Sequence, residues 1–184
     1  MLKELLLLPL TLLNRNKAIK AIESCIENRI FLFDIDNTIA DTIPSFENYS
    51  NLSEAKRVSS LAFFIKMHKL IRILKKSPNN KIIFLTARGF RSNKVTKKWL
   101  LDFGFNISND EFFIVRKADE KIKIIKALHL NCKQLYVIDD LSYLKKTGEV
   151  MIYDKLVIIL NKLSAQKKLK YYGINEIMGF IYKN

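Results

Sequence analysis

Residues 30–38 read Ile-Phe-Leu-Phe-Asp-Ile-Asp-Asn-Thr, and this stretch decides the fold. Its apolar start is rich in β-branched and aromatic side chains, which is typical of a strand buried on both faces of a parallel sheet. We therefore predict a strand over residues 30–35. Asp34 and Asp36 lie two positions apart at the end of this strand. Because ligands of open α/β sheets bind at the carboxyl ends of the strands, this acidic pair marks a candidate site.

Three further apolar runs have the same character and alternate with amphipathic helical patterns. We predict strands at 81–86, 112–115 and 135–138, and helices at 53–76, 92–103 and 119–130. This alternation predicts an α/β fold in which a central parallel sheet carries helices on both faces. The pattern is less regular after residue 140, where we predict one more short strand near 157–160 and a helical or strand-like tail.

Polar residues also follow the other predicted strands. Thr86 ends the second strand, and Asp139 and Asp140 follow the last one. If these ends are adjacent, the carboxylates converge, and their mutual repulsion calls for a cation. Carboxylate oxygens prefer hard cations, so we expect Mg²⁺. Such a site suits phosphoryl transfer, because one carboxylate can attack phosphorus while a second one handles the proton of the leaving group.

The ordered set of motifs resembles that of the haloacid dehalogenase superfamily. Residues 33–38, Phe-Asp-Ile-Asp-Asn-Thr, are similar to its first motif, DxDx[TV] after an apolar strand. Thr86 resembles the second motif, and the Asp139-Asp140 pair resembles the acidic fourth motif. The resemblance covers about residues 30–140. It implies a three-layer Rossmann-like fold and a Mg²⁺-dependent phosphatase, a hydrolase of phosphoric monoesters.

The resemblance also implies roles for single residues. Asp34 is the expected nucleophile, and Asp36 is the expected general acid for the leaving group and then the base for water. Thr86 would hydrogen-bond the phosphoryl group, and Thr38 would set the geometry of the loop beside the substrate. Dehalogenases and phosphonate hydrolases lack the second aspartate, so Asp36 favours phosphate esters. The implied metal ligands are Asp34, Asp36 (also through its backbone carbonyl), Asp139 and Asp140.

The lysine of the third motif has two candidates, Lys117 and Lys121. A helix that begins near Asp119 would place Lys121 in its first turn, near the strand ends. Lys117 lies earlier, in the preceding loop. We favour Lys121 as a catalytic residue and keep Lys117 as the alternative, in a position to contact the substrate.

A narrower resemblance concerns the phosphatase domain of bacteriophage polynucleotide kinase-phosphatases. Arg88 and Arg91 follow the second motif, and residues 96–100 read Thr-Lys-Lys-Trp-Leu, similar to the TxR and TxxWL patterns of that group. There an arginine after the second motif helps to bind the phosphate, so Arg88 and Arg91 are candidates for substrate binding. Thr96 and Trp99 are also consistent with simple anchoring of a helix. No GxxxxGK[ST] motif occurs, so we expect no kinase site in this sequence.

The segments that would carry a cap are short, so we expect a minimal cap and a single domain. An uncapped site can accept a bulky substrate end. A second copy of the chain can also cover such a site, so the sequence is compatible with a homo-oligomer. The expected parts are an N-terminal helical segment (1–29), a core with all four motifs (30–140) and a completing segment (141–184) of one domain over residues 1–184.

The composition bears on partners and on localisation. The chain has 32 Lys and Arg against 18 Asp and Glu, a net charge of +14, which either an AT-rich genome or a surface for anionic partners explains. Cys25 and Cys132 form no CxxC pattern, so we expect free thiols in a reducing cytoplasm. The apolar run 5–13 is too short to span a bilayer. For this N-terminal segment, we favour a helix packed on the domain over a targeting sequence or a peripheral membrane contact. We expect no stable membrane insertion.

Three functions follow from these observations. The leading one is a Mg²⁺-dependent phosphomonoesterase that works through an aspartyl phosphate and acts on a nucleotide or on the 3′-phosphate end of a polynucleotide. The second is a phosphatase of a small phosphorylated metabolite. The third is a catalytically silent module that binds nucleic acid or has a regulatory role, which the intact set of acidic residues disfavours.

Overall fold

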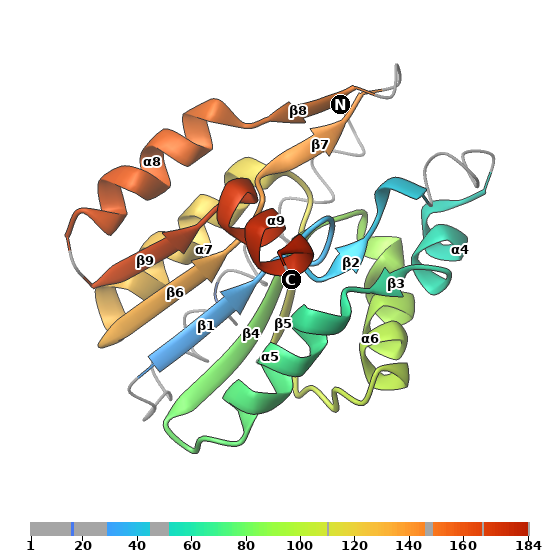
Figure 1. Ribbon diagram of the computed structural model, residues 1–184, viewed down its shortest axis with the longest axis horizontal. Helices are drawn as coiled ribbons and strands as arrows, with labels where there is room; N and C mark the ends of the chain where they lie inside the picture. Colours follow the sequence, from blue (N-terminus) through green and yellow to red (C-terminus); the bar gives the residue numbers. More distant parts are fainter. Residues whose placement is uncertain are drawn as a thin grey trace.

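Five parallel strands form the centre of the molecule (Figure 1). The structure, a computed structural model, describes residues 16, 29–44, 52–109, 111–145, 149–166 and 168–183. The strand order is β5-β4-β1-β6-β9, and each neighbouring pair is parallel. The predicted parallel sheet is therefore confirmed, and the strands predicted at 30–35, 81–86, 112–115 and 135–138 belong to it. The strands are β1 (Arg29–Phe33), β4 (Asn80–Ala87), β5 (Phe112–Val115), β6 (Gln134–Ile138) and β9 (Leu169–Tyr172).

Helices cover both faces of the sheet, as the alternating pattern predicts. Ile30 and Leu32 of β1 pack in one apolar layer, whereas Phe33 packs in the other. Because neighbouring side chains of a strand point to opposite faces, a strand between two helical layers is apolar throughout. One face carries α5 (Ile65–Lys75), α6 (Asn93–Asp102) and α9 (Ile174–Tyr182), and the other carries α7 (Ala118–Asn131) and α8 (Asp154–Ser164) (Figure 1).

Several short elements complete the described fold. Four short strands form two antiparallel pairs. One of these pairs is the hairpin of β7 and β8, which begins shortly after the end of β6. The described parts of the chain thus insert only small elements into the α/β core. The short elements are β2 (Ala40–Asp41), which pairs with β3 (Ala62–Phe63), β7 (Ser142–Leu144), which pairs with β8 (Val150–Ile152), α4 (Glu54–Ser59) and the 3₁₀ helix η1 (Phe90–Ser92).

The single helix predicted over residues 53–76 is wrong, because the segment divides into α4, β3 and α5. Phe63 of β3 stacks on Trp99 with ring centroids 5.1 Å apart. Trp99 also donates its indole N–H to the Leu61 carbonyl oxygen at 2.9 Å. Helical propensity is worth only a fraction of a kcal/mol per residue, so these long-range contacts outweigh the local pattern.

The short strand predicted near residues 157–160 is also wrong, because these residues belong to α8. Leu156 and Leu160 are buried four positions apart, whereas Ile158 between them is 53% exposed. Residues four positions apart lie on the same face of a helix, and the residue midway between them points elsewhere. This pattern of burial is therefore that of a helix with one buried face. The last strand of the sheet is β9, which pairs with β6.

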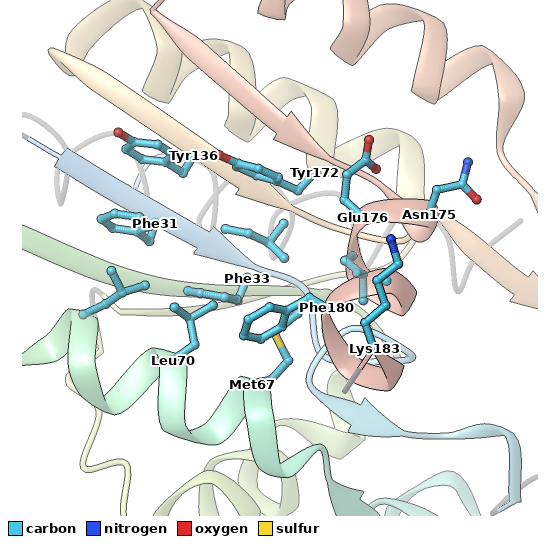
Figure 2. Close-up of a pocket in the computed structure, with 14 residues that line it drawn as sticks. Phe31, Phe33, Met67, Leu70, Tyr136, Tyr172, Asn175, Glu176, Phe180 and Lys183 are labelled. Atoms are coloured by element: carbon cyan, nitrogen blue, oxygen red, sulfur yellow. The ribbon is translucent and has the colours of Figure 1, made fainter.

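An apolar groove of about 650 Å³ lies over β1 and β6, between α5 and α9 (Figure 2). Phe31 and Tyr136 stack on its floor with ring centroids 4.4 Å apart. Met67 of α5 and Phe180 of α9 line it from the two sides. None of its lining residues is one of the predicted site residues, so the groove is separate from the acidic cluster.

The predicted N-terminal helical segment, residues 1–29, lies outside the described residues except for Asn16 and Arg29. Cys25 lies outside them as well, whereas Cys132 is a buried free thiol. Among the helices that the structure describes, none is both long enough and apolar enough to cross a membrane.

Candidate active site

The central strands end at one edge of the sheet and bring the predicted acidic residues together there. Phe33, the last residue of β1, is in register with Ile138, the last residue of β6. The next residue, Asp34, donates its backbone N–H to the Ile138 carbonyl oxygen at 2.9 Å. Asp139 and Asp140 continue directly from Ile138. The strand register thus places Asp34 beside this second acidic pair.

Lys121 lies between two of the carboxylates. Its Nζ is 2.8 Å from Asp34 Oδ1 and 2.9 Å from Asp139 Oδ2. Because α7 begins at Ala118, Lys121 occupies its first turn, where it is only 3% exposed. Lys117 is exposed at the N-cap of the same helix. Of the two lysine candidates, Lys121 thus contacts the acidic cluster, whereas Lys117 is exposed.

Burial and like charge shift the protonation equilibria of the cluster. Burial raises the pKa of Asp34 well above its ordinary value, although Lys121 acts in the opposite direction. Burial, and then the Asp139 carboxylate, raise the pKa of Asp140 to about 7. Burial alone would lower the pKa of Lys121, but the Asp139 and Asp34 carboxylates raise it. Three carboxyl groups thus share one ammonium group, which leaves a surplus of negative charge whenever all three are ionised.

The same three carboxyl groups fit a hard cation. One oxygen each from Asp34, Asp139 and Asp140 lies within 4.8 Å of the others, and all three residues are buried. Ligand oxygens of an octahedral Mg²⁺ lie at about 2.1 Å from the ion and so roughly 3–4 Å from one another. The spacing, the oxygen donors and the surplus of negative charge therefore suit Mg²⁺. The side chain of Asp36 does not belong to this cluster.

The Asp36 carboxylate points instead toward Arg88. Arg88 donates from Nη2 to Asp36 Oδ1 at 2.5 Å and from Nε to Asp36 Oδ2 at 2.7 Å. Thr42 donates to the first of these oxygens at 3.0 Å, and Thr86 donates to the second at 3.3 Å. Burial alone would raise the pKa of Asp36, but the Arg88 guanidinium lowers it below its ordinary value. Asp36 is therefore held as a carboxylate with both oxygens engaged.

Arg88 is held on its other side by α6. Its Nη1 donates to Thr96 Oγ1 at 3.2 Å, and the Thr96 residue is fully buried. Trp99, almost one turn later, is anchored to the Leu61 carbonyl oxygen. The TxxW spacing therefore serves two contacts, one with the arginine and one with the segment before β3. Arg91, the other arginine candidate, is exposed in η1.

Thr38 contacts Asp140. Its hydroxyl donates to Asp140 Oδ1 and accepts the Asp140 backbone N–H, both at 3.1 Å. Asn37 has a φ of 52°, a left-handed conformation that asparagine adopts more readily than most residues. Its Nδ2 donates to Ser142 Oγ at 3.2 Å, and the Ser142 hydroxyl donates to Asp140. The loop after β1 is therefore tied to Asp140 both directly and through Ser142.

A solved structure has a similar fold over nearly the whole chain. The class C acid phosphatase from Bacillus anthracis superposes on 95% of this chain and 81% of its own, with a TM-score of 0.53 and 11% sequence identity. This chain has the haloacid dehalogenase fold. At this identity the likeness concerns the fold alone. No family model matches the sequence.

One curated relative matches a part of the sequence. It is a Bacillus cereus protein that carries a provisional nucleotidase name, and it is 39% identical over 61 residues. The match spans 33% of this chain and 30% of the relative. The chain thus matches less than a third of that protein, and the nucleotidase name describes the relative.

A cavity of about 200 Å³ adjoins the acidic cluster. Asp34, Asp36, Lys121 and Asp139 line its polar part. The other lining residues are mainly apolar or aromatic and come from the loop after β1, from β4, from α7 and from the β7–β8 hairpin: Ile43, Ala87, Ala118, Leu141, Tyr143, Leu144 and Tyr153, with Asn37, Thr42 and Ser142. The acidic residues and Lys121 thus lie at the polar part of a partly apolar cavity.

Sequence reasoning missed four residues of this site: Thr42, Ser142, Tyr143 and Tyr153. Thr42 supports Asp36, and Ser142 supports Asp140. Their only sequence signal is nearness to a motif, because Thr42 comes four residues after Thr38 and Ser142 comes two residues after Asp140. Tyr143 has the same kind of signal, three residues after Asp140, whereas Tyr153 has none, since it reaches the cavity through the hairpin.

Proposed function

We propose that this chain is a Mg²⁺-dependent phosphomonoesterase that forms an aspartyl phosphate on Asp34. The observation that carries the proposal is the buried cluster of Asp34, Lys121, Asp139 and Asp140, with Asp36 lining the same cavity. A fold shared with an acid phosphatase and a partial match to a relative with a nucleotidase name support it.

The side chains of Asp34, Asp139 and Asp140 would hold the metal. When bound, Mg²⁺ would neutralise charge on the cluster and on the phosphoryl oxygens, which is its usual contribution to phosphoryl transfer. Thr38 and Ser142 keep Asp140 turned toward the cluster through their hydrogen bonds.

Asp34 and Asp36 have different roles in the proposed reaction. A carboxylate oxygen of Asp34 attacks phosphorus, and the bond from phosphorus to the ester oxygen breaks. Asp36 gives that oxygen a proton, which Asp36 can hold once Arg88 has turned its N–H donors from the Asp36 carboxylate to the phosphate. Asp36 then takes a proton from water as the water oxygen attacks the aspartyl phosphate, which releases inorganic phosphate and regenerates Asp34. Lys121 stabilises the negative charge around Asp34 in both steps, since its Nζ is 2.8 Å away.

Arg88 and Thr86 are the candidates to bind the phosphoryl group. Both now donate to Asp36, and the guanidinium group can pass its N–H donors to phosphate oxygens in a bidentate manner. Thr96 holds the third nitrogen of Arg88 and so keeps the guanidinium oriented. This pair of contacts supports the narrower resemblance to the phage kinase-phosphatases. Arg91 and Lys117, both exposed, would at most contact the outer part of a substrate.

We propose a nucleotide, or the phosphorylated 3′ end of a polynucleotide, as the substrate. The partial match to a nucleotidase-named relative and the net charge of +14 support a nucleic-acid-like anion. A small phosphorylated metabolite is the second candidate, favoured by the modest volume of about 200 Å³ of the cavity.

Hydrolysis of p-nitrophenyl phosphate tests the proposal. The wild type should release p-nitrophenol with Mg²⁺ and lose this activity with a chelator. Asp34→Asn, which keeps the shape of the side chain, should be inactive, whereas Lys123→Met on the exposed side of α7 should match the wild type. Inactivity of the wild type on this substrate and on a panel of 3′-phosphorylated oligonucleotides, mononucleotides and sugar phosphates would favour the binding module instead.

A further inference from the structure

The β7–β8 hairpin begins two residues after Asp140 and is fixed to the site at its base. The Ser142 hydroxyl donates to Asp140 and accepts a hydrogen bond from Asn37. Across the hairpin, the backbone N–H of Tyr153 donates to the Leu141 carbonyl oxygen at 2.8 Å. Both strands of the hairpin are therefore tied to the segment that carries the acidic pair.

Two tyrosines from this hairpin meet at the cavity. The rings of Tyr143 on β7 and Tyr153 just after β8 have centroids 4.6 Å apart and planes inclined by 37°. Both residues line the cavity that also contains Asp34 and Asp36. Tyr143 is 37% exposed, whereas Tyr153 is partly buried against the apolar core. Tyr153 thus supports Tyr143, and Tyr143 keeps ring surface open to a ligand.

The size of the cavity limits which part of a substrate it can enclose. Pockets that enclose a whole drug-sized ligand measure roughly 300–1,000 Å³, and this cavity measures about 200 Å³. It has room for a phosphoryl group and its nearest atoms but not for a whole nucleotide. The rest of the substrate therefore extends past the more exposed lining residues. Among these, Tyr143, Leu144 and Ile43 are aromatic or apolar, and they offer surface rather than charge.

We propose that Tyr143, supported by Tyr153, stacks on the base of a nucleoside monophosphate whose phosphate lies at Asp34. This inference rests on the proposed function and names the substrate class within it. Exposed aromatic rings are stacking platforms for bases, and every base offers a π-face. The enzyme therefore acts on several nucleoside monophosphates with little preference among bases, and it prefers them to phosphate esters of aliphatic alcohols.

Steady-state kinetics on two substrates tests the stacking. We compare adenosine monophosphate, as the 3′ and the 5′ isomer, with glycerol phosphate. Tyr143→Ala should lower kcat/KM for adenosine monophosphate by roughly 5- to 150-fold, the range that loss of one stacking ring produces, and should lower it far less for glycerol phosphate. Tyr143→Phe, which keeps the ring, should restore the preference. Tyr182→Ala, an exposed tyrosine on α9 outside the cavity, is the matched control and should leave both values unchanged.

Each alternative result has a definite meaning. Equal losses on both substrates would assign Tyr143 to the support of the hairpin and would overturn the stacking, as would unchanged kinetics in Tyr143→Ala. If the wild type hydrolyses neither substrate, the proposed function fails, and binding then decides the inference separately. Calorimetric titration should then give a weaker affinity of Tyr143→Ala for adenosine monophosphate with no change for inorganic phosphate. Equal affinities of wild type and variant for the nucleotide would overturn it.

Discussion

Lys121→Met should strongly destabilise the metal-free protein. The substitution keeps most of the length of the side chain but removes the ammonium group that contacts Asp34 and Asp139 at 2.8 and 2.9 Å. Loss of one partner of a buried ion pair costs about 3–5 kcal/mol, because the other charge remains buried and unpaired. For a chain of this size, 1 kcal/mol corresponds to a Tm change of about 2–4 °C. We therefore expect the Tm near neutral pH to fall by roughly 6–20 °C.

The pH dependence of this loss follows from the raised carboxyl pKa values. A carboxyl group with a raised pKa in the folded state, such as Asp140 at about 7, stabilises the protein below its unfolded pKa and loses that contribution as the pH rises through the folded value. Without Lys121 the carboxyl pKa values rise further, so the loss of stability should be larger at about pH 8 than at about pH 5.

Urea unfolding in buffer with a chelator measures this effect. The matched control is Lys123→Met, which removes an exposed lysine two residues further along α7. It should change the free energy of unfolding by less than about 0.5 kcal/mol. Equal stability of the two variants at about pH 8 would refute the inference that Lys121 neutralises the buried cluster.

Three further predictions concern the metal, the arginine and the tryptophan. Mg²⁺ should bind more tightly as the pH rises from about 5 to about 8, because its ligands must lose their protons; calorimetric titration checks this, and an affinity independent of pH would contradict it. Arg88→Lys keeps the charge but loses the bidentate geometry, so kcat/KM for p-nitrophenyl phosphate should fall about 10- to 100-fold, against no change in Arg91→Lys. Trp99→Phe removes the donor to the Leu61 carbonyl oxygen, and the free energy of unfolding should fall by about 1–3 kcal/mol in urea; an unchanged value would assign the role of Trp99 to ring packing alone.

The layers of the fold could be predicted from the sequence because their signals are local. A strand buried on both faces needs a continuous apolar run, and residues 30–33 have one whichever residues surround them. The acidic residues follow two such runs directly, so parallel pairing alone brings Asp34 close to Asp139 and Asp140. A helix predicted to begin near Asp119, one residue after the observed start at Ala118, also sufficed to place Lys121 in the first turn, near this edge.

The remaining features depend on contacts between distant residues. Phe63 lies in a strand and not in the predicted helix, because its ring stacks on that of Trp99 in α6. Ser142 donates to Asp140 and accepts a hydrogen bond from Asn37, which lies 105 positions away in the sequence. Leu156 and Leu160 carry a helical spacing, but their β-branched neighbours favour a strand locally, and only burial of one face separates the two. Such contacts require the positions of other elements, which a local pattern does not contain.

Rapid acid quenching tests whether the phosphoryl group is transferred to Asp34. Protein mixed with Mg²⁺ and a phosphate ester is quenched in acid during turnover, digested and analysed by mass spectrometry. We expect one added phosphoryl group on the peptide that contains Asp34 in the wild type and none in Asp34→Asn. A phosphoryl group on another peptide, or turnover that persists in Asp34→Asn, would contradict it.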